Sequence, residues 1–437
     1  MGRLALLTLL FVFLVSCRET FAFIQTCRNH QSSRRLNTLQ LSSNSEESPK
    51  EIVKRATSTF ETTFASNRQV QNPRIKKLTN VISRSRVTSK PPNTSYKIAY
   101  DYDELIIGDT DSANTTAVML VHPIGVGIGR WYYDRLMKSL ADADLQQGRI
   151  VFLSPDLLGS YTASSPMSVD SGKQLKKFPL LNITDWAEQL ESLMREYEIE
   201  SHNDGYKINN WSIVANGGCA PIALKVAQSA VDKSAPFEKD LTNVVISSPP
   251  RLSFFLEGSD PKRVQKSYRT LSGIVGNLFW RYSLRKDGKF IQTFSERNLV
   301  GDPDRLGKHW TPNCVSAARH QGGKSKYSTF AFLAGALQDG CQASLDSLKG
   351  KNVQIDFIRG TERKRRRRPK SFFWKRKKTS NKSADTEMNV IEETVEEYMQ
   401  RNGNRGSVSL IGGRISLAWE DSGGYAKELI KLLLLKE

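Results

Sequence analysis

The sequence has few cysteines and no long hydrophobic run. Of its five cysteines, only Cys219, Cys314 and Cys341 lie beyond the N-terminal region, and their spacing fits neither a disulfide framework nor a metal site. We therefore expect buried thiols, no metal ion and no cofactor. No segment reaches the roughly 18 consecutive apolar residues that a membrane-spanning helix needs, so the mature chain is not expected to span a membrane.

Excess charge is also missing from most of the chain, although the formal net charge is +19. Residues 23–95 contribute +9, residues 363–378 contribute +11 without any acidic residue, and residues 1–22 add +1. The remainder sums to about −2 and is close to neutral. A basic face across the whole folded body, of the kind that binds nucleic acid, is therefore not expected.

The N-terminus has the composition of two consecutive targeting signals. Residues 1–22 contain Arg3, an apolar run and a final small residue, Ala22, which is the pattern of a secretory signal peptide. Residues 23–95 are rich in Ser, Thr, Asn and Arg, as in a transit peptide or disordered presequence. The pair resembles the bipartite plastid presequences of algae with secondary plastids and predicts plastid (chloroplast) import by the secretory route. The alternative is a secreted or endoplasmic reticulum protein.

From about Tyr96 onward, short β-branched runs alternate with helical stretches. This alternation predicts an α/β fold with a mostly parallel central sheet and helices on both faces. Between residues 251 and 350 the strand pattern stops and apolar residues recur at helical spacing, which predicts an inserted helical cap. The body then divides into a first core part (96–250), the cap (251–350) and a second core part (351–437).

A glycine-rich turn follows the apolar run that ends at His122. Gly125, Gly127 and Gly129 are evenly spaced, which does not fit the G-x-G-x-x-G pattern of a dinucleotide-binding loop. A loop of this kind can offer backbone N–H groups to a developing oxyanion. His122 and Gly125 are therefore candidates for a pocket or oxyanion loop, together with Gly218 further along the chain.

Residues 211–227 predict a strand, a tight turn and an apolar helix, which is the layout of a nucleophile elbow. The elbow pattern G-x-S-x-G places a nucleophile between small residues. Here Ala215 and Cys219 occupy the flanks and Gly217 the centre, so the central position has no side chain that could form a covalent intermediate. Cys219 is the alternative nucleophile, although we expect its side chain to turn away and pack.

The two other positions of a Ser-His-acid triad are altered as well. Only Glu362 is approximately placed for the acid, and a basic tract follows it directly. Arg414 stands where a histidine is expected after the last strand, and none of the five histidines lies beyond residue 320. Gly217, Glu362 and Arg414 thus define a degenerate site, and we assign no residue a catalytic role.

Several motifs together resemble an α/β-hydrolase-like subgroup of cyanobacteria and plastids that also lacks the elbow serine. The motifs are LVHPIGVGIGRWYYDRL, SPDLLG, WAEQL, SPP, STFAFLAG and GGRISLAWEDS. The chain departs from the subgroup at Ala418, where proline is usual, and in the insertion after Glu362. The resemblance implies an α/β-hydrolase fold but not hydrolysis.

Two functional hypotheses follow from the altered positions. The first is a non-hydrolytic protein that binds a small apolar ligand under the cap, or a partner protein. The second is an active hydrolase or lyase whose displaced chemistry uses His122, Glu362 or Cys219.

The segment 362–387 is predicted to be a disordered insertion because of its composition. Residues 363–378 place three aromatic residues between two cationic clusters, a combination that suits an anionic membrane surface. The third functional hypothesis is therefore a peripheral membrane-associated module that acts through this tract. A solvated loop without a partner is an alternative of equal weight, and RNA binding is one that we favour less. The candidates for membrane contact are Arg365, Arg366, Phe372, Phe373, Trp374 and Lys375.

Deleting residues 363–378 is expected to weaken flotation of the protein with anionic liposomes. The deletion removes eleven positive charges and three aromatic rings, both of which favour an anionic interface. Flotation of the intact and the shortened chain measures the difference. Equal binding of the two proteins would exclude the tract as the membrane-binding element.

Overall fold

The computed structural model describes most of the chain between Lys76 and Leu434. The described residues are 76–86, 94–109, 115–143, 145, 148–164, 167–168, 179–323, 325–338, 341–362, 394–404 and 406–434. The predicted signal peptide, most of the predicted presequence, the basic tract and the six membrane-contact candidates lie outside these residues.

Among the described residues, nine strands form one sheet in the order β1-β2-β4-β3-β6-β7-β8-β9, with β5 paired to β2. The strands are β1 (Lys76–Arg86), β2 (Thr94–Gly108), β3 (Thr115–Val121), β4 (Arg149–Pro155), β5 (Met167–Ser168), β6 (Ile208–Asn216), β7 (Asp240–Ser247), β8 (Gln354–Gly360) and β9 (Val408–Ile411). Every neighbouring pair from β4 to β9 is parallel, whereas β1, β2 and β5 pair antiparallel. The predicted mostly parallel sheet is confirmed.

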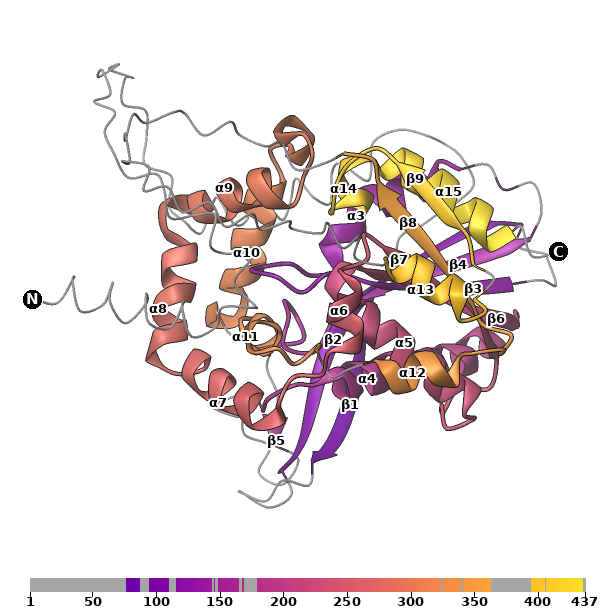
Figure 1. Ribbon diagram of the computed structural model, residues 1–437, viewed down its shortest axis with the longest axis horizontal. Helices are drawn as coiled ribbons and strands as arrows, with labels where there is room; N and C mark the ends of the chain where they lie inside the picture. Colours follow the sequence, from indigo (N-terminus) through magenta and orange to yellow (C-terminus); the bar gives the residue numbers. More distant parts are fainter. Residues whose placement is uncertain are drawn as a thin grey trace, which may run out of the picture. The chain divides into compact units, whose positions relative to one another are not determined.

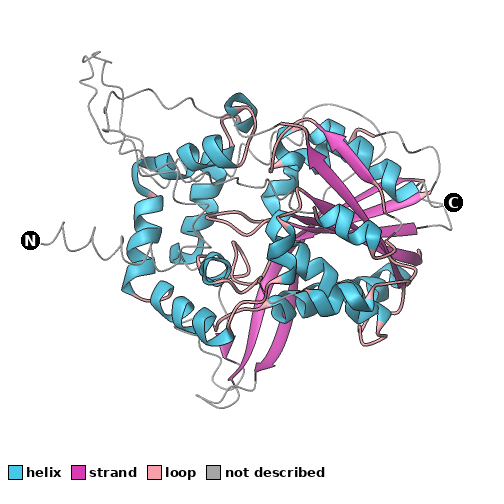
Figure 2. Ribbon diagram, viewed as in Figure 1, coloured by secondary structure: helices cyan, strands magenta, loops and turns pink. Residues whose placement is uncertain are grey.

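Helices cover both faces of the sheet, as predicted (Figures 1 and 2). The core helices are α3 (Asp134–Ala141), α4 (Ile183–Asn203), α5 (Ala220–Val231), α12 (Gln342–Ser347), α13 (Val395–Arg401), α14 (Leu417–Glu420) and α15 (Ser422–Leu434). α3 packs with α15, and α4 and α12 pack against α5. The central strands β3 and β4 are almost wholly buried, because parallel strands lie between two layers of helices.

The N-terminal boundary of the folded body differs from the prediction. β1 lies within the range 23–95 that the composition assigns to a presequence, so the described fold begins at Lys76 and not at residue 96. β1 pairs along its full length with β2, from Lys76 opposite Glu104 to Arg86 opposite Thr94. An edge strand is held by main-chain hydrogen bonds and is often rich in charged residues. Its composition therefore resembles that of a presequence.

The predicted helical cap lies between β7 and β8. It contains α6 (Leu252–Leu256), α7 (Pro261–Leu271), α8 (Ile274–Ser283), α9 (Lys289–Asn298), α10 (Trp310–Gly323) and α11 (Tyr327–Ala334), with the short 3-10 helices η5 (Arg285–Gly288) and η6 (Pro303–Leu306). α12 falls inside the predicted cap range but packs on the core helix α5, where Ser344 Oγ donates to Gln228 Oε1 at 2.9 Å. Helical spacing alone does not reveal which layer a helix joins.

Three tryptophans join the cap to the core. Trp131 belongs to the 3-10 helix η3 (Arg130–Tyr133) after β3, Trp310 begins α10 of the cap, and Trp419 belongs to α14. Their ring centroids are 5.2–5.4 Å apart in edge-to-face geometry, and each is at most 6% exposed. Arg135 lies 4.0 Å from the Trp419 ring and donates to the Arg305 carbonyl at 2.9 Å. The cluster therefore connects three segments that are distant in sequence.

Gly127, in the loop after β3, allows this loop of the core to pack closely against the cap. A Cβ at Gly127, where φ is +69°, would overlap the carbonyl oxygen of Cys314 on α10. The carbonyl of Gly127 accepts a hydrogen bond from Trp131 Nε1 at 3.0 Å. The glycine at this position thus lets the loop lie directly against the cap.

Replacing Gly127 with alanine is expected to lower the free energy of unfolding by several kcal/mol. The added methyl group overlaps the α10 backbone, and overpacking costs about 1–3 kcal/mol in addition to the strain of a positive φ. Gly205→Ala is the matched control, because Gly205 has φ +82° and no neighbour within 4 Å of its Cβ position. Urea unfolding measures both variants, and equal losses would contradict the close approach of loop and cap.

Candidate functional site

Gly217 lies at the sharp turn between β6 and α5. It opens the 3-10 helix η4 (Gly217–Cys219), is buried and has φ +47°. Among its described neighbours, a Cβ at this position would meet only the Ser248 carbonyl oxygen within 4 Å, at 3.5 Å. The turn therefore keeps the positive φ of an elbow and has room for a Cβ, although the residue has no side chain.

Aromatic residues of the cap lie beside the elbow. A Cβ at Gly218 would approach Phe332 Cε2 to 3.0 Å and Phe254 Cζ to 3.9 Å. Phe254 belongs to α6 and Phe332 to α11, and both rings are partly exposed. The surroundings of Gly218 on the cap side are thus apolar.

Cys219 is inaccessible as a nucleophile. Its side chain is 1% exposed, and burial raises the pKa of its thiol to about 12, against an opposing hydrogen bond from the Ile124 backbone. At neutral pH the thiol therefore stays protonated, and the thiolate is the reactive form.

The side chains of Glu362 and Arg414 contact residues of the cap and not each other. Glu362 follows β8 and forms an ion pair with Arg305 of the cap, with Nη1 and Oε1 2.7 Å apart. Arg414 follows β9, and its Nη1 donates to the carbonyl of Arg297 on α9 at 3.1 Å. The structure brings the backbones of the two loops together, because Glu362 N donates to the Gly413 carbonyl at 2.9 Å. The two side chains do not form an acid–base pair.

The loop that contains Arg414 is anchored by Glu420, a residue that the sequence analysis did not identify. Glu420 accepts hydrogen bonds from Arg414 N at 3.0 Å and from Gly301 N of the cap at 2.7 Å. Burial raises the pKa of the Glu420 carboxyl, and these backbone donors oppose the rise. Ser416 N also donates to the Leu299 carbonyl at 3.1 Å. The loop therefore connects the end of β9 to the cap.

Asn216, immediately before Gly217, is a second residue that the sequence analysis missed. Its side-chain nitrogen lies 3.1 Å from Tyr132 Oη, 3.1 Å from Ser247 Oγ and 3.2 Å from the Ile415 carbonyl. Asn216 is 3% exposed. A single amide thus holds the ends of β6 and β7 against η3 and the Arg414 loop. The only sequence signal was a polar residue at the end of an apolar strand.

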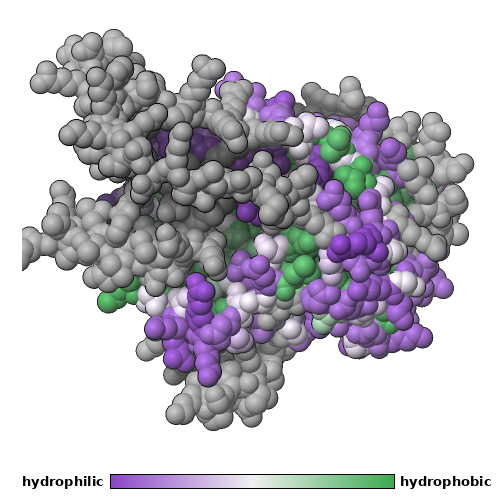
Figure 3. Space-filling model, viewed as in Figure 1, coloured by the Kyte–Doolittle hydropathy of each residue, from purple (hydrophilic) through white to green (hydrophobic). Residues whose placement is uncertain are grey.

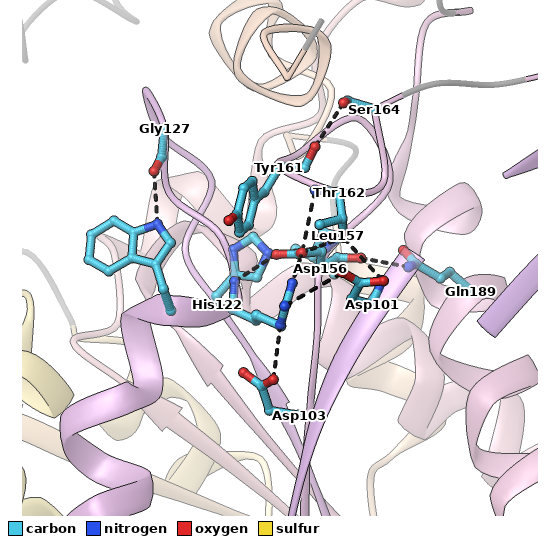
Figure 4. Close-up of polar contacts among 12 residues, drawn as sticks. Asp101, Asp103, His122, Gly127, Asp156, Leu157, Tyr161, Thr162, Ser164 and Gln189 are labelled. Carbon is cyan, nitrogen blue, oxygen red and sulfur yellow. Dashed lines mark hydrogen bonds and ion pairs between the residues drawn. The ribbon is translucent and has the colours of Figure 1, made fainter. Parts of the chain in front are cut away.

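His122 is fully buried beneath the loop after β4 (Figure 4). Its Nε2 accepts from Leu157 N at 3.1 Å, and Nδ1 lies 3.0 Å from the Pro123 carbonyl. This arrangement fits a neutral ring protonated on Nδ1, and burial lowers the pKa of the imidazole. Both ring nitrogens are therefore occupied by backbone groups. Gly125, in the same loop, accepts from Thr329 Oγ1 of α11 at 2.9 Å.

A buried ionic cluster lies next to His122. Arg130 contacts Asp156 at 2.5 Å, Asp103 at 3.0 Å and Asp101 at 3.6 Å, and Figure 4 shows the three carboxylates around one position. Thr162 Oγ1 also donates to Asp156 at 2.6 Å. The neighbouring carboxylates raise the pKa of Arg130 although burial lowers it. The cluster joins β2, β3 and β4 at one end of the sheet.

The described part of the chain contains no group of three His, Cys, Asp or Glu side chains arranged to hold a metal ion. No helix of this part combines the length and hydropathy needed to cross a membrane.

The chain is similar to known proteins in its three-dimensional structure but not detectably in its sequence. No protein-family model matches the chain, and no curated protein matches it. The peroxisomal alpha-beta-hydrolase Lpx1 of Saccharomyces cerevisiae is similar, with a TM-score of 0.51 and 12% identity over 83% of this chain and 89% of Lpx1. The hydrolase BphD of Rhodococcus sp. strain RHA1 has a TM-score of 0.44 and 12% identity over 82% and 99% of the two chains. At these identities the likeness concerns the fold.

Cys219 is expected not to react with iodoacetamide in the native protein at pH 8. Its burial and its raised pKa leave almost no exposed thiolate. Mass spectrometry of the alkylated peptide measures the reaction, and Ile199→Cys provides an exposed control because Ile199 is 56% exposed. Labelling of Cys219 as fast as that of the control would contradict the buried position.

Proposed function

Because the chain has the α/β-hydrolase fold, we propose that it is a non-hydrolytic protein that binds a small apolar ligand between the elbow and the cap. The observation that carries the proposal is Gly217. The residue retains the positive φ of an elbow and room for a Cβ, but it has no atom that could attack a substrate.

The surroundings of the elbow support a loss of hydrolysis. A serine nucleophile needs a base within hydrogen-bond distance and an acid that orients the base. Arg414 and Glu362 occupy the corresponding positions and bind Arg297 and Arg305 instead. The thiol of Cys219 is buried and protonated at neutral pH. Restoring one group would therefore not restore the chemistry.

The cap side supports an apolar ligand. Phe254 and Phe332 lie within 4 Å of a Cβ placed at Gly218, so a ligand above the elbow would contact aromatic rings. Binding sites for small molecules are mostly apolar and largely formed before binding. The tryptophan cluster and the Glu420 hydrogen bonds hold the cap on the core. We further propose that the protein is imported into plastids. The two targeting signals predicted in the N-terminal sequence support this localisation.

The protein is expected to remain unlabelled by a fluorophosphonate probe and to gain thermal stability from an apolar lipid. A ligand present at 100 times its dissociation constant stabilises the folded state by about 2.7 kcal/mol. Gel fluorescence detects the label, and a thermal-shift screen of fatty acids and isoprenoid lipids detects the ligand. Gly217→Leu, which places a bulky side chain at the elbow, is expected to abolish the shift.

Gly205→Leu is the control for this experiment, since it places the same side chain at a positive φ with no neighbour nearby. Probe labelling of the wild-type protein at any residue near Gly217 would overturn the loss of hydrolysis. A thermal shift that survives in Gly217→Leu would place the ligand elsewhere.

A further inference from the structure

The outer helices of the cap are strongly cationic. Residues 261–289, which span α7, α8, η5 and the first residue of α9, contain eight Lys or Arg residues and one acidic residue, Asp287, giving a formal charge of +7. All eight basic side chains are exposed: Lys262, Arg263, Lys266, Arg269, Arg281, Arg285, Lys286 and Lys289. None of them takes part in an ion pair with another described residue. The sum of about −2 for the chain outside residues 1–95 and 363–378 conceals this local charge.

The basic residues of α7 share one side of the helix. Lys262, Lys266 and Arg269 are separated by four and three residues, so they project in similar directions. The described residues that line a surface hollow here are Pro261, Lys262, Gln265, Lys266, Arg269 and Thr270. The three cations therefore border open space.

An apolar stripe lies on the adjacent helix, α8. Ile274, Leu278 and Tyr282 are 80%, 39% and 56% exposed, and their i, i+4, i+8 spacing places them along one face. The Tyr282 ring lies 5.8 Å from Phe290 of α9, which in turn lies 6.2 Å from Phe279. The exposed stripe thus continues into a group of aromatic rings. Figure 3 shows hydrophobic atoms at the left edge beside a hydrophilic patch over α7.

We propose that this edge of the cap, formed by α7 and α8, docks onto the surface of an anionic lipid bilayer. An amphipathic surface places apolar side chains at the boundary between headgroups and acyl chains, while Lys and Arg contact anionic headgroups. Ile274 and Leu278 supply the aliphatic contact, and Tyr282 offers an amphipathic ring for the interface. The surrounding cations have no other described partner to neutralise them.

Charge also argues against a second copy of the chain as the occupant of this surface. Self-association through α7 and α8 would bring two segments of +7 together, and close like charges repel. An anionic bilayer provides both the opposite charge and an apolar layer for the α8 stripe. The residues of this surface are not part of the basic tract at residues 363–378, and the inference does not depend on the ligand proposed for the elbow.

Hydroxyl-radical footprinting of the full chain tests the docking surface directly. With vesicles of phosphatidylglycerol and phosphatidylcholine, oxidation of Ile274, Leu278 and Tyr282 is expected to fall at least about threefold. Pure phosphatidylcholine vesicles are expected to leave it unchanged, because the cations then have no anionic partner. Ile199 and Leu410, which are 56% and 65% exposed, serve as internal controls that stay oxidised.

A charge-reversal variant provides the second arm of the test. Replacing Lys262, Lys266 and Arg269 with glutamate is expected to lower affinity for the anionic vesicles at least about tenfold. The matched control reverses three other exposed lysines, Lys351, Lys427 and Lys431, and changes the net charge equally. The control is expected to lose much less affinity.

Three results would overturn the proposal. The first is vesicle binding without protection of α8, which would assign the binding to another segment. The second is an equal loss of affinity in both charge-reversal variants, which would mean that only net charge matters. The third is protection of α8 that rises with protein concentration in the absence of vesicles, which would identify a second copy as the occupant.

Discussion

The edge-to-face cluster of Trp131, Trp310 and Trp419 is the contact on which the arrangement of cap and core depends. Its rings come from the loop after β3, the first residue of α10 and the short helix α14. Each such aromatic pair contributes about 0.5–1.5 kcal/mol beyond the burial of its apolar area. Because all three rings are buried, separating the cap from the core would expose them together. Gly127 is part of the same constraint, since only a residue without a Cβ lets the loop reach the α10 backbone.

The loops after β8 and β9 also contribute to the contact between cap and core. Glu362 pairs with Arg305, and Arg414 binds the carbonyl of Arg297, so both side chains are directed to the cap. Glu420 links the loop after β9 to Gly301 through two backbone N–H groups. These contacts use the same sheet edge at which hydrolases of this fold place their catalytic groups. The hydrogen bonds and the ion pair of these two loops therefore hold the cap on the core.

The sequence predicted the parallel sheet, the position of the cap and the missing side chain at the elbow, because these follow from periodicity and residue identity. It placed the start of the fold too late, since the edge strand β1 has the composition of a presequence. It assigned α12 to the cap because helical spacing does not identify the layer on which a helix packs. Asn216, Arg130 and Glu420 were missed for a related reason. Their partners are far away in the chain, and no local pattern distinguishes them from other polar residues.

What the sequence determined by itself is the absence of a nucleophile at Gly217 and of a histidine at position 414, because a missing functional group is a property of the residue. Only the tertiary structure decided where the remaining charges act. It directs Glu362 and Arg414 to the cap and surrounds Arg130 with three carboxylates. It also leaves all eight cations of residues 261–289 exposed on the cap, which their clustering in the sequence could not show. The net charge counted from the sequence does not say which charged groups lie close together or are buried, whereas electrostatic interactions depend on distance and burial.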